Sequence, residues 1–305
     1  QVQERLQKLN LVAEQILQDQ VGEVAAEMGL TLGGQPVPPV LFHATPLPLA
    51  LIVSPRDEIR QLTDISLAPG LAVEDQVALE AEVDQAQEVS SLVVNIGGVG
   101  VYPTMVNQTS SLPWLTEVIS HEWVHNFLTL RPLGINYFSS PEMRTINETV
   151  AAIAGKEMGV RLLQLYYPEL APPPAASTPG SIPVEKPAEP VFDFYDEMRL
   201  TRVEVDELLS EGKIQEAEDF MEQRRIVFWE HGYRHLRKLN QAYFAFHGAY
   251  ADQAGGGAAG EDPVGAAVRA FRANSSSLGD FVEKISWMSS FEDLQRAVAA
   301  LENTH

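Results

Sequence analysis

Apolar residues recur at helical spacing along most of this chain, and two short stretches break that pattern with continuous apolar runs. The first 30 residues carry an amphipathic repeat, which predicts one long helix, either packed on the domain or serving as a stalk. Apolar runs at 49–53 and 91–96 predict strands, with a helix near 73–86 between them. The run 101–106 contains a proline, so we expect an edge strand or an extended loop there.

The rest of the chain is mainly helical in pattern. Ser111 and Pro113 suit the start of one helix, and a second helix is expected over about 146–165. A stretch rich in Pro, Ala and Ser, 169–190, indicates a linker or insertion. We therefore divide the chain into four parts, an N-terminal amphipathic helix at 1–34, a lobe with the strands at 35–168, the Pro-rich segment at 169–190 and a helical lobe at 191–305.

Composition narrows the possible partners and ligands. Asp and Glu total 42 against 21 Lys and Arg, and this net charge of −21 argues against nucleic acid and anionic membranes as partners. The chain has no Cys, so any metal site must use His and carboxylate ligands. Because the chain begins at Gln1, we expect that a signal peptide or membrane anchor has been removed, which favours an extracytoplasmic or membrane-associated bacterial protein.

The sequence HEWVH at 121–125 carries the strongest chemical signal. His121 and His125 are four residues apart, so on a helix both imidazoles lie on one face and can reach one Zn²⁺ ion. Glu122 is offset by one residue, which places its carboxylate beside the open coordination position as a general base for water. Because zinc lowers the pKa of a bound water to about 7, one carboxylate suffices as the base.

A catalytic zinc site needs a third protein ligand. The metzincin pattern requires a Gly and a third His soon after His125, and the chain lacks both there. The first carboxylates downstream are Glu142, in an expected loop after Pro141, and Glu148, in the expected second helix. Small residues beside Glu148 would let its helix approach the motif helix closely, so Glu148 is favoured and Glu142 is the second choice. The small residues are Ala151, Ala152 and Gly155.

The HExxH motif at 121–125, followed by Asn147-Glu148-x-x-Ala151, resembles the gluzincins, the superfamily of thermolysin and the M1 aminopeptidases, over about residues 90–165. The resemblance implies an α+β fold, with a zincin-like catalytic lobe built on a small mixed sheet and then a mostly helical C-terminal lobe. It implies hydrolysis of a peptide or protein substrate, with one Zn²⁺ ion held by His121, His125 and Glu148. The stretch 237–243 is also similar to poorly characterised bacterial proteins labelled as aminopeptidases.

The chain departs from gluzincin patterns at two places. M1 enzymes carry a Gly-x-Met-Glu-Asn motif whose Glu grips the free amine of the substrate, whereas 98–105 contains no acid. Thermolysin-like enzymes have an Asp four residues after the ligand Glu, where this chain has Ala152, so the partner that orients the histidines must come from elsewhere. The glycine run at 97–100 is expected to lead into an edge strand to which a substrate peptide pairs.

Exo- or endo-action therefore stays open, as do two other functions, an inactive zincin-like scaffold and a zinc hydrolase of a non-peptide substrate. The resemblance also calls for an oxyanion donor from the helical lobe, usually Tyr or His. A stripe on one expected helix supplies candidates, of which Tyr250 and Tyr243 are the first choices and His247 is the third. Three further polar residues are expected at the surface or at interfaces, namely Arg144, His231 and His235.

Overall fold

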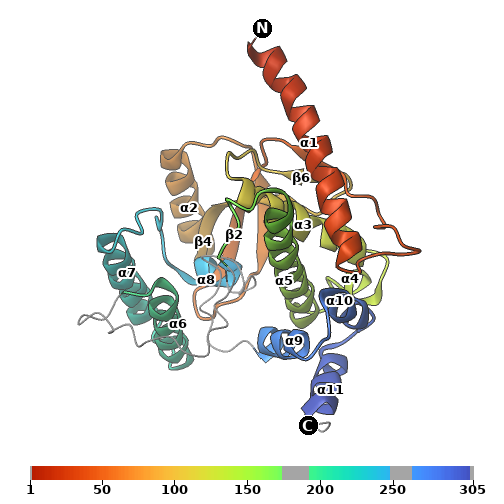
Figure 1. Ribbon diagram of the computed structural model, residues 1–305. Coiled ribbons are helices and arrows are strands. Elements are labelled where there is room, and N and C mark those ends of the chain that lie inside the picture. The colour runs from red at the N-terminus through yellow and green to blue at the C-terminus, as the bar shows by residue number, and fades with distance from the viewer. Residues whose placement is uncertain (1, 174–191, 248–262, 303–305) are drawn as a thin grey trace, which may run out of the picture.

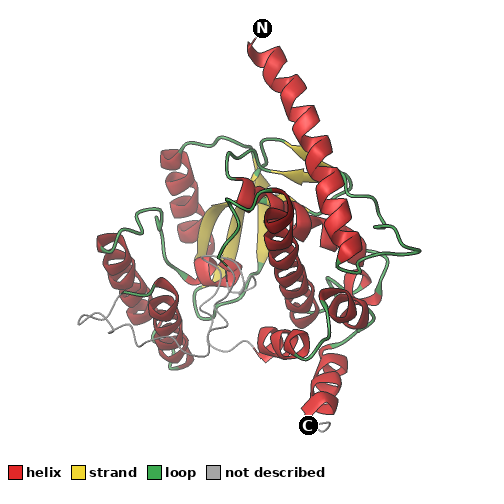
Figure 2. Cartoon of the chain, viewed as in Figure 1, coloured by secondary structure: helices red, strands yellow, loops and turns green. Residues whose placement is uncertain are grey.

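Helices surround two small sheets in the computed structural model of this chain, which describes residues 2–173, 192–247 and 263–302 (Figure 1). The strands are β1 (Phe42–Ala44), β2 (Leu49–Pro55), β3 (Thr63–Leu67), β4 (Val89–Asn95), β5 (Gly98–Val99) and β6 (Thr104–Val106). The helices are α1 (Val2–Glu27), α2 (Val73–Gln87), α3 (Leu112–Leu128), α4 (Pro132–Ile135), α5 (Pro141–Tyr166), α6 (Phe194–Ser210), α7 (Ile214–Glu230), α8 (Gln241–His247), α9 (Pro263–Ala273), α10 (Leu278–Ser286) and α11 (Phe291–Glu302). The fold is therefore mixed α and β with a helical C-terminal region, as predicted (Figure 2).

The larger sheet has the antiparallel order β3-β2-β4, and its central strand is buried on both faces. Because side chains alternate along a strand, Leu51 packs toward α2 while its neighbour Ile52 packs into a core shared with α8. A strand covered on both sides is expected to be continuously apolar, and β2 is apolar from Leu49 to Val53.

The smaller sheet has the order β1-β6-β5, with β6 parallel to β1 and antiparallel to β5. The prediction that 101–106 forms an edge strand or a loop is wrong for its second half, because β6 is the middle strand. Pro103 lies just before the first strand residue, Thr104, whose own backbone N–H donates to the carbonyl of Leu41 at 3.0 Å. The proline therefore removes no hydrogen bond from the sheet, and the edge strands are β1 and β5.

The main core lies between α3 and α5, which pack closely because α5 has glycines at the contact. A Cβ atom at Gly155 would lie 2.9 Å from Cβ of His121, and one at Gly159 would lie 3.1 Å from Cα of Glu117. The close approach expected from small residues is thus present. The helix begins at Pro141, earlier than the predicted 146, because Ser140 caps it by accepting a hydrogen bond from the Met143 backbone at 3.2 Å.

The C-terminal helices divide between two cores. Helix α8 lies against one face of the larger sheet and shares a core with α6 and α7, whereas α9, α10 and α11 return to the α3–α5 core (Figure 1). Arg272 on α9 pairs with Glu157 on α5 at 2.8 Å, across 115 residues of sequence.

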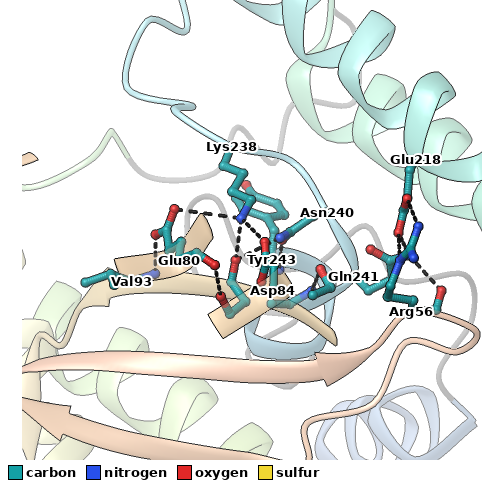
Figure 3. Close-up of polar contacts among 12 residues, drawn as sticks. Arg56, Glu80, Asp84, Val93, Glu218, Lys238, Asn240, Gln241 and Tyr243 are labelled. Carbon is teal, nitrogen blue, oxygen red and sulfur yellow. Dashed lines mark hydrogen bonds and ion pairs between the residues drawn. The ribbon is translucent and has the colours of Figure 1, made fainter. Parts of the chain in front are cut away.

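A polar network fixes the segment before α8 to the larger sheet (Figure 3). Buried Glu80 on α2 accepts hydrogen bonds from the Val93 backbone at 2.6 Å and from Arg237 at 2.8 Å. Lys238 donates to Asp84 at 2.8 Å, and further contacts continue along the segment (Figure 3). These contacts attach the segment that leads into α8 to α2 and β4.

Helix α1 enters the main core through its second half, and Glu14 just before that half accepts a hydrogen bond from the Ala44 backbone at 2.8 Å. Val21 and Val24 are buried in the main core, whereas Leu9 and Val12 are exposed on the half that protrudes (Figure 1). None of the helices in the described part of the chain is both long and apolar enough to span a membrane.

Candidate metal centre

Three potential ligand atoms meet between α3 and α5. The Nε2 atoms of His121 and His125 lie 3.1 Å apart, and Oε2 of Glu148 lies 3.6 and 3.4 Å from them. Among the described residues, this is the group of three His or carboxylate side chains that the structure brings together. Glu142, the second choice as a ligand, is exposed in the first turn of α5 rather than in a loop, and it is not part of the cluster.

The spacing of these atoms fits a metal ion. Ligand bonds of about 2.0–2.1 Å at tetrahedral angles separate the ligand atoms by about 3.3–3.4 Å, and the three distances above lie around that value. Oε2 of Glu148 is buried and accepts no hydrogen bond. A buried carboxylate oxygen without a donor is costly, and a cation at the centre of the cluster would satisfy it.

The two histidines and Glu148 shift one another's pKa values. Burial alone would lower the pKa of His125, but the Glu148 carboxylate beside it raises that pKa to about 9. Burial alone would raise the pKa of Glu148, but His125 and His121 hold it well below its ordinary value. The carboxylate therefore stays ionised and attracts positive charge, which protons supply when no metal is bound.

Asn147 orients His125. Its side-chain oxygen lies 2.8 Å from Nδ1 of His125, and its amide nitrogen donates to the carbonyl of Leu133 at 3.3 Å. The second bond fixes which way the amide points, so Nδ1 of His125 carries a proton and Nε2 is the ring nitrogen left to bind a metal ion. The partner that the sequence left unassigned for this histidine is thus the residue directly before the third ligand.

Tyr137 orients Glu148. Its hydroxyl donates a short hydrogen bond to Oε1, which leaves Oε2 facing the two histidines. Burial and the neighbouring carboxylate both raise the pKa of Tyr137, so the phenol stays protonated and remains a donor. Tyr137 lies in an irregular segment between α4 and α5, eleven residues before its partner.

Glu122 lies beside the cluster, against the backbone of the edge strand. A Cβ atom at Gly98 would lie 2.5 Å from Cγ of Glu122, and one at Gly100 would lie 3.3 Å from its Oε2. Burial raises the pKa of Glu122, with the two histidines opposing the shift. A carboxylate with a raised pKa is a better proton acceptor near neutral pH than an exposed one.

The cluster opens into a large cavity of about 1120 Å³. Its walls come from the β5 segment, from α3, from the connection around α4 and from the last turn of α8, where Phe246 and His247 line it. Burial lowers the pKa of His247 to about 4, so this imidazole is neutral at physiological pH. A neutral donor or acceptor therefore lines the same cavity as the possible metal ligands.

The candidate oxyanion donors are placed differently from one another. Tyr243 is buried in the core beneath α8 and is not among the residues that line the cavity, whereas His247, the third choice, lines it. Tyr250 lies outside the described residues. The role of Tyr243 and Tyr250 as oxyanion donors stays a prediction.

The other polar residues singled out from the sequence lie around the cavity or away from it. His235 is exposed and lines the cavity. His231 stacks on Phe192 with ring centres 3.9 Å apart, away from the cluster. Arg144 lies 3.9 Å from Asp64 and 5.9 Å from the ring centre of Tyr137, and it does not line the cavity.

Comparisons of the chain with protein-family models, with curated proteins and with solved structures found no match. The structure itself shows a cluster of His121, His125 and Glu148 that is able to hold a metal ion.

Proposed function

We propose that this protein is a zinc-dependent peptidase of the gluzincin kind. The observation that carries the proposal is the convergence of two imidazole nitrogens and one unbonded carboxylate oxygen at tetrahedral spacing, beside a large cavity. Two histidines and one glutamate are a donor set used by catalytic zinc sites, which keep one coordination position open. The HExxH and Asn-Glu-x-x-Ala motifs support the gluzincin assignment.

Each residue of the site has a separate task in this proposal. Bound zinc would supply Lewis acidity to the substrate carbonyl and to water. Glu122 accepts the proton that the attacking water loses and returns it to the departing amine, a role that its burial and raised pKa suit. Asn147 and Tyr137 hold His125 and Glu148 in the orientation that points their free atoms at the centre of the cluster.

Two observations favour catalysis over an inactive scaffold. A scaffold would need the three ligands but not a buried carboxylate beside them, and burying Glu122 costs stability. A scaffold would also not need the cavity that leads to that carboxylate. A zinc hydrolase of a non-peptide substrate would use the same residues, so the substrate itself decides between these two.

Metal content and cleavage of a peptide library test the proposal, with wild type and three variants. We expect one zinc per chain in wild type and in Glu122→Gln, with peptide cleavage in wild type only. Glu148→Ala should lose zinc, whereas Glu142→Ala, a matched change in the exposed first turn of α5, should keep both zinc and activity. The proposal fails if zinc-loaded wild type cleaves no peptide that Glu122→Gln spares, and the ligand assignment fails if Glu148→Ala binds zinc as tightly as wild type.

A further inference from the structure

We infer that the cavity takes the interior of a peptide chain, with apolar side chains on both sides of the cleaved bond, and not a charged chain end. This inference rests on the proposed peptidase function and names its substrate class. It is carried by the residues that line the cavity, by its length along α3 and by the apolar residues exposed at its rim.

The described lining of the cavity offers no ionic anchor for a chain terminus. It contains no Lys, Arg or Asp, and its carboxylates are Glu122 and Glu148, which belong to the cluster itself. An enzyme that selects a free amine needs an acid to pair with it, and one that selects a free carboxylate needs a cation. Arg144 hydrogen-bonds the wall residue Tyr137 and lies 3.9 Å from Asp64, but it is not itself among the residues that line the cavity.

The cavity extends to both sides of the cluster. Trp114 and Thr129, near opposite ends of α3, both line it. Fifteen residues of helix span about 22 Å, and an extended peptide covers that length with about six residues. His121 and His125 lie between those two ends, so a peptide whose terminus stopped at the cluster would leave part of the cavity unfilled.

Large apolar side chains contribute to the wall beside the first half of α3, together with the uncharged amides of Asn95 and Asn107. Trp114 and Val118 lie four residues apart on one face of α3, and Phe246 of α8 lines the same cavity. The Trp114 ring lies so close to the backbone that a Cβ atom at Gly97 would be 3.1 Å from its Cζ2. A charged substrate side chain placed here would lose water without meeting an opposite charge in the described lining, whereas an apolar one would gain contact area.

The rim beyond the cluster is also apolar, and it is exposed. Phe138 and Val101, which both line the cavity, are 91% and 45% exposed. Asn126, one residue after the second histidine, holds the Val101 carbonyl at 3.1 Å, so this rim directly adjoins the cluster. Leu130 and Ile135 nearby are 85% and 69% exposed. Large apolar side chains gathered at the mouth of a cavity indicate a binding surface, and the polypeptide that enters the cavity is what they would contact.

Peptides with blocked ends test the inference. We would use acetylated and amidated six-residue peptides with Leu and Phe at the two central positions, and the same peptides with Asp or Lys at those positions. We expect cleavage of the blocked apolar peptide at an interior bond, with a kcat/KM at least tenfold and up to about 200-fold above that of the charged peptides. Unblocking either end should change kcat/KM little. Cleavage that requires a free end, or that favours a charged central residue, overturns the inference while the peptidase proposal stands.

Two cavity variants test which residues cause the preference for apolar peptides, and a third variant serves as the control. Trp114→Ala should lower the ratio of apolar to charged kcat/KM by about tenfold, and Phe138→Ser should lower it as well. Leu200→Ser, a matched change at a residue that is 52% exposed on α6 and does not line the cavity, should leave the ratio as in wild type. Equal ratios in wild type and in both cavity variants would contradict the inference.

Binding to zinc-loaded Glu122→Gln separates the two hypotheses. Titration of the blocked peptides, followed by tryptophan fluorescence, measures affinity without cleavage. At least tenfold tighter binding of the apolar peptide supports the inferred ligand class. That support holds even if wild type cleaves no peptide and the peptidase proposal fails. Equal binding of apolar and charged peptides overturns it.

Discussion

Replacing Gly98 by Ala is expected to displace Glu122, the proposed general base, while the protein still folds and still binds zinc. The added Cβ would lie 2.5 Å from Cγ and 2.6 Å from Oε1 of Glu122. Gly98 has no positive φ angle, so alanine can adopt its backbone conformation. The three nearest atoms all belong to the Glu122 side chain rather than to the backbone, so the side chain is the part that moves.

The size of the effect follows from the overlap. Non-bonded carbon atoms prefer separations of about 3.5–4.0 Å, so the Glu122 side chain must retreat by about 1 Å. A displacement of about 1 Å at a reacting group costs about 10²-fold in rate, which corresponds to about 2.7 kcal/mol in the activation free energy. Overpacking costs about 1–3 kcal/mol of folding stability in a rigid core, and we expect the lower end here because a side-chain terminus can rotate away.

Three measurements on one preparation check this prediction: kcat with a cleaved peptide, bound zinc, and the urea midpoint of unfolding. Gly22→Ala on α1 is the matched control, since its added Cβ would meet Val40 Cγ2 at an ordinary 3.9 Å. That variant should keep full activity and gain up to about 1 kcal/mol of stability, because alanine is the better helix former.

Two outcomes would refute the reasoning. Wild-type kcat in a folded, zinc-loaded Gly98→Ala variant would show that the position of Glu122 does not limit the reaction. Loss of zinc or of folding in that variant would show that the backbone or the ligands, and not the Glu122 side chain, absorb the clash.

Three further changes test other parts of the structure. Tyr137→Phe removes the donor that holds Oε1 of Glu148, so zinc affinity should fall about 10- to 100-fold in a chelator competition, and unchanged affinity would contradict its orienting role. Glu80→Ala leaves Arg237 without its buried partner and should lower the free energy of unfolding in urea by about 3–5 kcal/mol, so a loss below 1 kcal/mol would refute the importance of the network. Backbone and side-chain hydrogen bonds from Ser289 help to hold the pKa of Asp293 at about 2, below its ordinary 3.8, so its stabilising effect is present above pH 4 and is lost as the pH falls through 2. The difference in melting temperature between wild type and Asp293→Asn should therefore be much smaller at pH 2 than at pH 6, and a difference that is the same at pH 2 and pH 6 would contradict this.

The features that the sequence predicted well are those that depend on neighbours along the chain. The HExxH spacing places His121 and His125 on one face of any helix, and Ser111 and Pro113 mark the start of α3. Glu148 followed from small residues at helical spacing, because such residues imply a close helix pair wherever the second helix lies. The three residues of the candidate metal centre could therefore be predicted from local patterns alone.

The features that the sequence predicted poorly depend on contacts between distant segments of the chain. The position of β6 in the middle of its sheet depends on pairing with β1, more than 60 residues earlier, and no pattern within 101–106 reports that partner. Tyr137 lies in an irregular segment, where no periodicity shows which way a side chain points. The early start of α5 did carry a local signal, Ser140 followed by Pro141, which is an N-cap and first-turn pair as well as a loop signal.

The return of α9 to the α3–α5 core has a consequence for how the protein is made. Arg272 pairs with Glu157 across 115 residues, so the outer side of α5 has no α9 to cover it until the ribosome has synthesised that intervening length. At about 5–20 residues per second, this takes roughly 6 to 23 s. During that interval α3 and α5, which carry the cluster residues, have been synthesised, but α9 does not yet pack against α5. The nascent chain should therefore acquire its final metal affinity only after its C-terminal helices have left the ribosome.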